Sequence, residues 1–202
     1  MRRRRQKMKK KVWFGIIAAA MVMACAGCSK KADSETVPKD LFANLSTVDF
    51  EGNEVTADIF KENDLTLINT WATWCGPCVG EIPELQEVSD ELEKEGTKVA
   101  IKGLVIEVTE GDTNELGIYA GLSEKERKSV QEVLDATKAT YQQLLVSEEL
   151  AASPLGKQAG FPTTYFVDKN GELVGAPITG SEDKAGWKKI IEERLEEVKN
   201  EK

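Results

Sequence analysis

The residues with the clearest chemistry are two cysteines separated by two residues, in Trp74-Cys75-Gly76-Pro77-Cys78. They lie where an apolar, β-rich run ends and a helical pattern begins. Unpaired N–H groups and the helix dipole at a helix N-terminus stabilise an anion, so a thiol there has a lowered pKa. We therefore expect Cys75 to be an exposed attacking thiolate. Cys78, one turn later and more buried, would resolve mixed disulfides.

The three residues around these cysteines support the same interpretation. Gly76 and Pro77 allow a tight turn and begin the helix, because proline at the first helical position has no N–H partner to lose. Trp74 is expected either to shelter the site from one side or to pack in the core.

Two other uses of a cysteine pair are poorly supported. Tetrahedral zinc needs four ligands, but the chain has no histidine, and its other cysteines, Cys25 and Cys28, lie in or beside the N-terminal apolar segment. A structural disulfide across two residues closes a very small loop and removes little unfolded-state entropy. We therefore expect a redox-active disulfide, with no metal and no other cofactor.

Composition excludes further classes. The chain has 202 residues, of which 41% are hydrophobic and 31% charged, and this is enough for one domain with a proper core. The absence of histidine excludes imidazole acid–base catalysis. Residues 1–27 carry 8 of the 27 basic residues and none of the 35 acidic ones, which leaves a net charge of −16 for the remainder. Such an acidic domain does not attract nucleic acid through its general field.

The first 27 residues have the pattern of a bacterial lipoprotein signal peptide. A cationic block precedes an apolar run over residues 12–27, which is shorter than the roughly 20 residues of a spanning helix. Small residues directly before Cys28 resemble a lipidation site, with Cys25 as the alternative. An uncleaved anchor and ordinary secretion are the other interpretations. All three place the domain outside the cytoplasm.

Residues 28–39 are polar and aperiodic, and we expect them to form a flexible tether to one domain over residues 40–202. Strand and helix patterns alternate in that domain, which predicts an α/β fold with a central mixed β-sheet flanked by helices. A capping box, Ser123 with Glu126, begins one helix, and Pro83 should kink another. The expected strands are 44–50, 65–71, 99–108, 141–146 and a hairpin of 163–168 with 172–176; the expected helices are 57–61, 78–95, 123–137 and 183–199.

Two motifs resemble the thioredoxin superfamily and, within it, the membrane-anchored TlpA/ResA branch. The first runs from Leu67 through the cysteine pair to Leu85, and the second runs from Gly160 to Asp168, followed by Asn170-Gly171. The resemblance covers about residues 40–198. It implies a thioredoxin-like fold with an N-terminal β extension and a helical insertion, at about residues 111–140, before a cis-proline loop.

The resemblance also implies that Pro162 is cis and packs beside the cysteines. A proline there exposes neighbouring backbone at an edge, so that a substrate segment can pair with it as an added strand. Phe161, directly before it, would shape what fits, unless it belongs to the core.

A proton acceptor is expected for the resolving cysteine. Asn69 stands where thioredoxins carry a buried aspartate, and the TlpA/ResA branch places a glutamate after the next strand. This alignment assigns the role to Glu110, with a pKa raised by partial burial, or to Glu107 if the register is shifted. An exposed loop acid is the alternative.

These observations together predict an extracytoplasmic thiol-disulfide oxidoreductase, lipid-anchored at the outer face of the cytoplasmic membrane. Its expected direction is reduction, with electrons from a membrane dithiol carrier resembling CcdA. The expected clients are exported disulfide-containing proteins such as apo-cytochrome c or a methionine sulfoxide reductase. The fold works as a monomer. A thiol peroxidase or antioxidant protein and a redox-inert surface binding lipoprotein are the alternatives.

Overall fold

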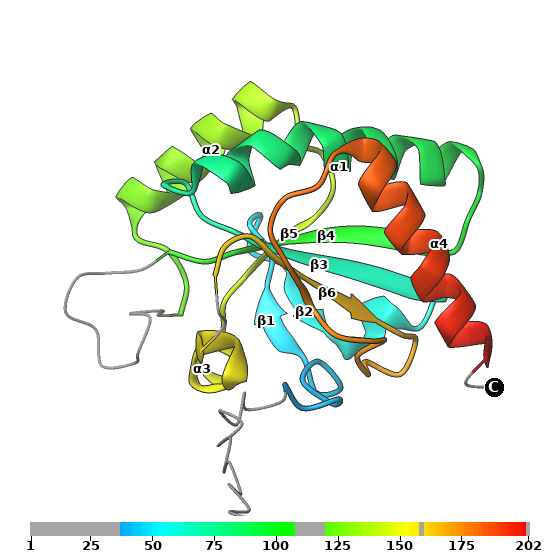
Figure 1. Cartoon of the computed structure of the whole chain (residues 1–202). Helices are drawn as coiled ribbons and strands as arrows, with labels where there is room; N and C mark the ends of the chain where they lie inside the picture. Colours follow the sequence, from blue (N-terminus) through cyan, green and yellow to red (C-terminus); the bar gives the residue numbers. More distant parts are fainter. Residues whose placement is uncertain (1–36, 108–119, 158–159, 201–202) are drawn as a thin grey trace, which may run out of the picture. The chain divides into compact units, whose positions relative to one another are not determined.

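The computed structural model describes residues 37–107, 120–157 and 160–200 of the chain (Figure 1). The predicted signal peptide with Cys25 and Cys28, most of the tether, and Glu110 lie outside the described residues. No helix within the described ranges is long and apolar enough to cross a bilayer.

A five-stranded mixed sheet forms the centre of the domain, in the order β5-β4-β3-β6-β7. The central strand β3 is buried along its whole length, which explains why its sequence is largely apolar and β-branched and lacks charged residues. Strands β4 and β5 run parallel to β3, and β6 runs antiparallel to it. The bounds are β3 Leu65–Trp71, β4 Val99–Val105, β5 Gln143–Leu145, β6 Thr163–Val167 and β7 Ile178–Thr179.

Three helices cover one face of this sheet, and short elements cover the other (Figure 1). Successive β3 side chains point to opposite faces of the sheet, so Leu67 packs against the helical layer and Ile68 packs in the cluster on the other face. The helical layer contains α1 Gly76–Lys94, α2 Glu124–Thr137 and α4 Lys184–Asn200. The opposite layer contains β1 Ser46–Val48, β2 Glu54–Thr56, η1 Ala57–Phe60, α3 Glu148–Ala152 and η2 Pro154–Lys157.

The predicted mixed sheet with an N-terminal β extension is therefore confirmed, the extension being the antiparallel β1–β2 pair. The Ser123 capping box is present with both of its hydrogen bonds. Helix α1 continues through Pro83, so this proline does not end the helix.

The predicted hairpin is wrong in its second arm. Val174 N still donates to Phe166 O, but β7 begins only at Ile178 instead of within residues 172–176. Gly175 has a positive φ of 66°, and Pro177 has no N–H to donate. The pairing is therefore interrupted and resumes after them.

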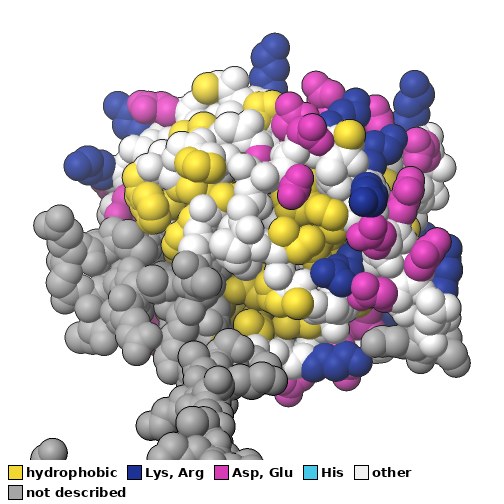
Figure 2. Space-filling model, viewed as in Figure 1, with side chains coloured by type: hydrophobic (Ala, Val, Ile, Leu, Met, Phe, Trp, Pro, Cys, Tyr) yellow, Lys and Arg dark blue, Asp and Glu magenta, His cyan; other side chains and the backbone are white. Residues whose placement is uncertain are grey.

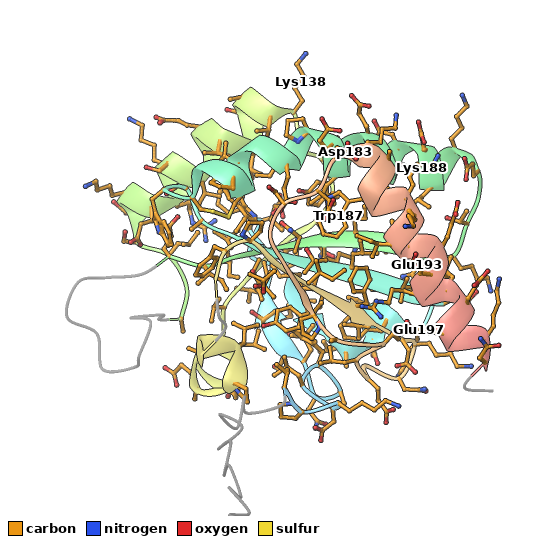
Figure 3. All side chains as sticks on the ribbon, viewed as in Figure 1. Lys138, Asp183, Trp187, Lys188, Glu193 and Glu197 are labelled. Atoms are coloured by element: carbon orange, nitrogen blue, oxygen red, sulfur yellow. A yellow bond between two sulfur atoms is a disulfide. The ribbon has the colours of Figure 1, made fainter. Side chains whose placement is uncertain are left out.

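The outer surface of the helical layer is charged. Basic and acidic side chains are interspersed over α4 and the neighbouring part of α1, as Figure 2 shows. Lys184 and Lys188 of α4 both pair with Glu91 of α1, each at 2.6 Å. Trp187 points inward from the same turns and is fully buried (Figure 3). The two helices are thus joined by an apolar contact inside and ion pairs outside.

Candidate functional site

The two cysteines form a disulfide at the first turn of α1. Cys75 is the N-cap residue, and its Sγ accepts a hydrogen bond from the backbone N–H of Cys78 at 3.3 Å. This is the place where a sulfur anion would be stabilised after reduction. Cys75 is more accessible than the fully buried Cys78, but its exposed fraction is only 5%, so the expectation of an exposed Cys75 is wrong in degree.

An aromatic surface lies beside the disulfide. Trp74 is 54% exposed, which excludes the alternative of a core role. Its ring meets that of Phe161 edge-on, at 72° and with 5.4 Å between the centroids. Gly76 and Pro77 are also exposed. Phe161 is partly buried and packs against both core clusters, in line with the predicted core role; its role in shaping what binds stays a prediction.

The Phe161–Pro162 peptide bond is cis, as the resemblance implied. The strand register explains how this loop reaches the cysteines, because Thr163 pairs with Thr70 at the end of β3 that leads to α1. The Thr70 hydroxyl accepts from Thr163 N at 3.0 Å and donates to Thr163 O at 2.8 Å. Gly180 N donates a hydrogen bond to Pro162 O at 2.9 Å. These bonds fix the loop at the end of the strands where the disulfide lies.

A buried carboxylate that the sequence analysis missed lies one turn after Cys78. Glu81 is 2% exposed; its Oε1 accepts from Asn69 Nδ2 at 2.9 Å, and its Oε2 accepts from Glu182 N at 3.4 Å. Burial raises the pKa of Glu81 to about 7, although the hydrogen bonds from Asn69 and Glu182 oppose that rise. A carboxyl group with this pKa can accept and release a proton near neutral pH.

A signal for Glu81 was present in the sequence. The buried stripe of α1 includes Cys78, Ile82 and Leu85, and Glu81 lies within it at helical spacing. An acidic residue on an apolar face is a candidate for a shifted pKa, because it must be buried with the face.

The register alternative, Glu107, has a different partner. It is 5% exposed, and its Oε1 accepts a hydrogen bond from the backbone N–H of Thr73 at 2.9 Å. The structure therefore places this carboxylate on the turn that precedes Cys75.

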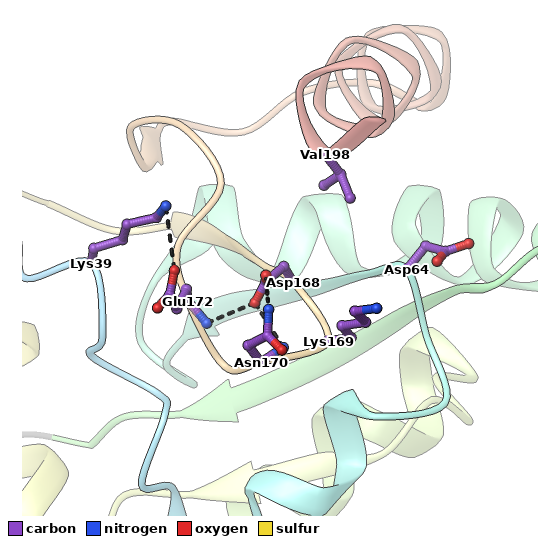
Figure 4. Close-up of a pocket in the computed structure, with 7 residues that line it drawn as sticks. All are labelled: Lys39, Asp64, Asp168, Lys169, Asn170, Glu172 and Val198. Atoms are coloured by element: carbon purple, nitrogen blue, oxygen red, sulfur yellow. Dashed lines mark hydrogen bonds and ion pairs between the residues drawn. The ribbon is translucent and has the colours of Figure 1, made fainter. Parts of the chain in front are cut away.

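No group of acidic, cysteine and histidine side chains that could hold a metal occurs among the described residues. A pocket of about 510 Å³ lies at the opposite end of the sheet, around the β6 turn and the start of β3 (Figure 4). Its polar groups are largely engaged with each other, as in the Lys39–Glu172 ion pair at 3.3 Å. Its lining residues are Lys39, Asp64, Asp168, Lys169, Asn170, Glu172 and Val198.

The fold and the disulfide at the helix start define a thioredoxin-like oxidoreductase. A family model described as AhpC/TSA family matches residues 38–176, so the chain belongs to that family. The thiol-disulfide oxidoreductase ResA of Geobacillus thermodenitrificans is 26% identical over 144 residues, which are 71% of this chain and 70% of that protein. ResA of Oceanobacillus iheyensis is 28% identical over 107 residues, which are 53% of this chain and 45% of that protein.

Solved structures agree in fold. A thiol:disulfide interchange protein from Chlorobium tepidum superposes with a TM-score of 0.56 at 21% identity, covering 81% of this chain and 99% of that one. StoA from Bacillus subtilis gives 0.52 at 20% identity, covering 72% and 93%. The predicted thioredoxin-superfamily, ResA-like membership and the class of thiol-disulfide oxidoreductase are confirmed.

Proposed function

We propose that this protein reduces disulfides of exported client proteins by dithiol–disulfide exchange. The observation that carries the proposal is the Cys75–Cys78 disulfide at the start of α1, beside a cis-proline loop and an exposed aromatic pair. The catalytic residues are Cys75 and Cys78.

In the reaction, the Cys75 thiolate attacks one sulfur of the client disulfide, and the other client sulfur leaves as a thiolate that takes up a proton. Cys78 then loses its proton and attacks the Cys75 sulfur, which releases the second client sulfur as a thiol. The client gains two electrons and two protons, and the enzyme is left as the disulfide. Glu81 is our candidate for the group that accepts the Cys78 proton, because it is buried one helical turn away and its pKa is raised to about 7. Glu110, the acceptor expected from the sequence, lies outside the described residues and stays a prediction.

Client binding uses the surface around the disulfide. Trp74 and Phe161 offer an apolar contact for residues that flank a client cysteine, and Gly76 and Pro77 are exposed next to the cysteines. An extended client segment could pair as an added strand with the backbone directly before Pro162.

The reductive direction and the location rest on the sequence. The Gly-Pro dipeptide between the cysteines matches thioredoxin, and the N-terminal segment resembles a lipoprotein signal with Cys28 as the lipidated residue. In this proposal the protein is anchored at the outer face of the cytoplasmic membrane and receives electrons from a dithiol carrier resembling CcdA. Its clients are exported proteins such as apo-cytochrome c or a methionine sulfoxide reductase.

The test is insulin reduction by the full chain with dithiothreitol as electron donor, together with equilibration against glutathione. We expect catalysis that Cys75→Ser abolishes, and a reduction potential well below that of strong oxidants, which lie near about −120 mV. A potential near that value would overturn the reductive direction. Equal activity of Cys75→Ser and the wild type would overturn the proposal itself.

A trapping experiment identifies the client and the donor. The Cys78→Ser variant keeps the attacking sulfur but cannot resolve, so partners remain bound to Cys75 as mixed disulfides.

A thiol peroxidase is the alternative enzyme, and the family model that matches carries the name AhpC/TSA. This alternative predicts rapid dithiothreitol-dependent consumption of hydrogen peroxide instead.

A further inference from the structure

Glu107 is a buried carboxylate beside the disulfide for which the exchange chemistry has no use. It lies two residues after the end of β4, and Ile106 N donates to Trp71 O at 2.8 Å, so the last backbone hydrogen bond between the two chain segments lies one residue before it. Burial of a carboxylate is unfavourable unless strong hydrogen bonds compensate. Its position therefore needs a specific explanation.

The strand register gives this explanation. Trp71 of β3 pairs with Val105 of β4, and two further steps along both chains place Thr73 opposite Glu107. Beyond Trp71 the chain turns away from the sheet toward Cys75, where backbone pairing can no longer follow. The Glu107 side chain reaches Thr73 N at 2.9 Å and provides the next hydrogen bond of the series.

The turn held in this way carries the reactive groups. Within it, Cys75 N donates to Ala72 O at 3.1 Å, and this bond closes the turn without attaching it to the sheet. The Glu107–Thr73 bond adds the attachment to a neighbouring strand. Trp74 and Cys75 come directly after Thr73, so their placement depends on where this N–H is held.

We propose that Glu107 is a positioning residue that continues the β3–β4 pairing through its side chain and so fixes the turn that presents Trp74 and Cys75. The carboxylate acts as a hydrogen-bond acceptor in this role and transfers no proton. The inference rests on the proposed function for its kinetic consequence and on the structure alone for its effect on the disulfide.

Two substitutions separate the hydrogen bond from the charge. Glu107→Gln removes the charge and keeps an oxygen that can accept from Thr73 N. Glu107→Met fills a similar volume and has no such acceptor, and an apolar side chain at a buried site is compatible with folding. Because both variants lose the charge, the difference between them isolates the hydrogen bond.

We expect Glu107→Met to lower kcat/KM for insulin reduction about tenfold relative to Glu107→Gln, the factor that corresponds to about 1.4 kcal/mol for leaving the partly buried Thr73 N–H unpaired. We also expect the equilibrium constant for disulfide formation against glutathione to fall in Glu107→Met by a similar factor, because the two thiols are held less closely together.

The control is Asp49→Ala. Asp49 is 4% exposed and, like Glu107, accepts a backbone hydrogen bond, here from Asn53 N at 2.8 Å; it also accepts side-chain bonds from Asn53 and Gln142, and it belongs to the β1–β2 turn. This variant should lose stability toward urea and keep both redox readouts.

Equal values for the Met and Gln variants in both measurements would overturn the inference, whether both variants match the wild type or both are impaired. The proposed function could fail separately, since a wild type that cannot reduce insulin still yields the glutathione equilibrium. In that case the Met-to-Gln ratio of the equilibrium constants decides the role of Glu107.

Discussion

The pH dependence of stability offers a direct test of the buried Glu81. In the folded protein the pKa of the Glu81 carboxyl is raised to about 7, whereas the ordinary pKa of a glutamate is 4.5. Between these values the folded state binds more protons than the unfolded state, so the free energy of unfolding must fall as pH rises through this window. A difference of this size corresponds to about 3 kcal/mol, fully lost above the folded-state pKa.

Glu81→Gln removes the titration and keeps the side-chain volume. The assay is urea unfolding of the oxidised protein at several pH values between about 4.5 and 8, with the stability of the variant minus that of the wild type as the quantity of interest. This difference should rise by about 3 kcal/mol from the acid to the alkaline end, because every other carboxyl group contributes equally to both proteins.

Glu93→Gln is the matched control, since Glu93 is an exposed glutamate of the same helix. The Glu81→Gln curve is compared with the curve of this control. The same curve for both variants would refute the argument that burial raises the pKa of Glu81, and with it our choice of this group as the proton acceptor.

Three further substitutions test single contacts: the exposed indole beside the disulfide, the close packing at a glycine of β4, and the N-cap of α2. Trp74→Ala should raise KM for protein disulfides and lower kcat/KM about tenfold, with little change in unfolding free energy, because the exposed indole contacts clients more than core. Gly103→Ala should lower the unfolding free energy by about 1–3 kcal/mol in urea titrations, since a Cβ there would lie 1.8 Å from Gln143 Oε1, which Trp71 Nε1 already binds. Ser123→Ala should cost about 1 kcal/mol in the same assay through loss of the α2 N-cap.

The central elements were predictable because local pattern and tertiary environment agree there. The run of residues 65–71 is rich in apolar and β-branched residues since β3 is buried on both faces, and its predicted bounds match the structure. Ser123 begins α2 with side-chain bonds that involve only its near neighbours. The cysteine pair needs only the strand before it and the helix after it.

The parts that depended on long-range geometry could not be predicted. The role of Glu107 follows from the β3–β4 register, which sets a residue 34 positions away opposite Thr73. The depth of burial of Cys75 likewise depends on segments distant in sequence. The expectation that Glu110 accepts the proton of the resolving cysteine rests on alignment alone. The burial of Glu81, in contrast, is recognisable from its helical spacing to the apolar residues of α1.

The entry of the chain into the domain constrains how a tethered molecule would work. Lys39 O accepts from Leu173 N at 2.7 Å, and the Lys39 side chain pairs with Glu172, so the first described residues are fastened near the start of β3. The disulfide follows the other end of this seven-residue strand, about 20 Å further on. Under the proposed lipid anchoring, the chain would therefore enter the domain about one strand length from the disulfide, at the opposite end of β3.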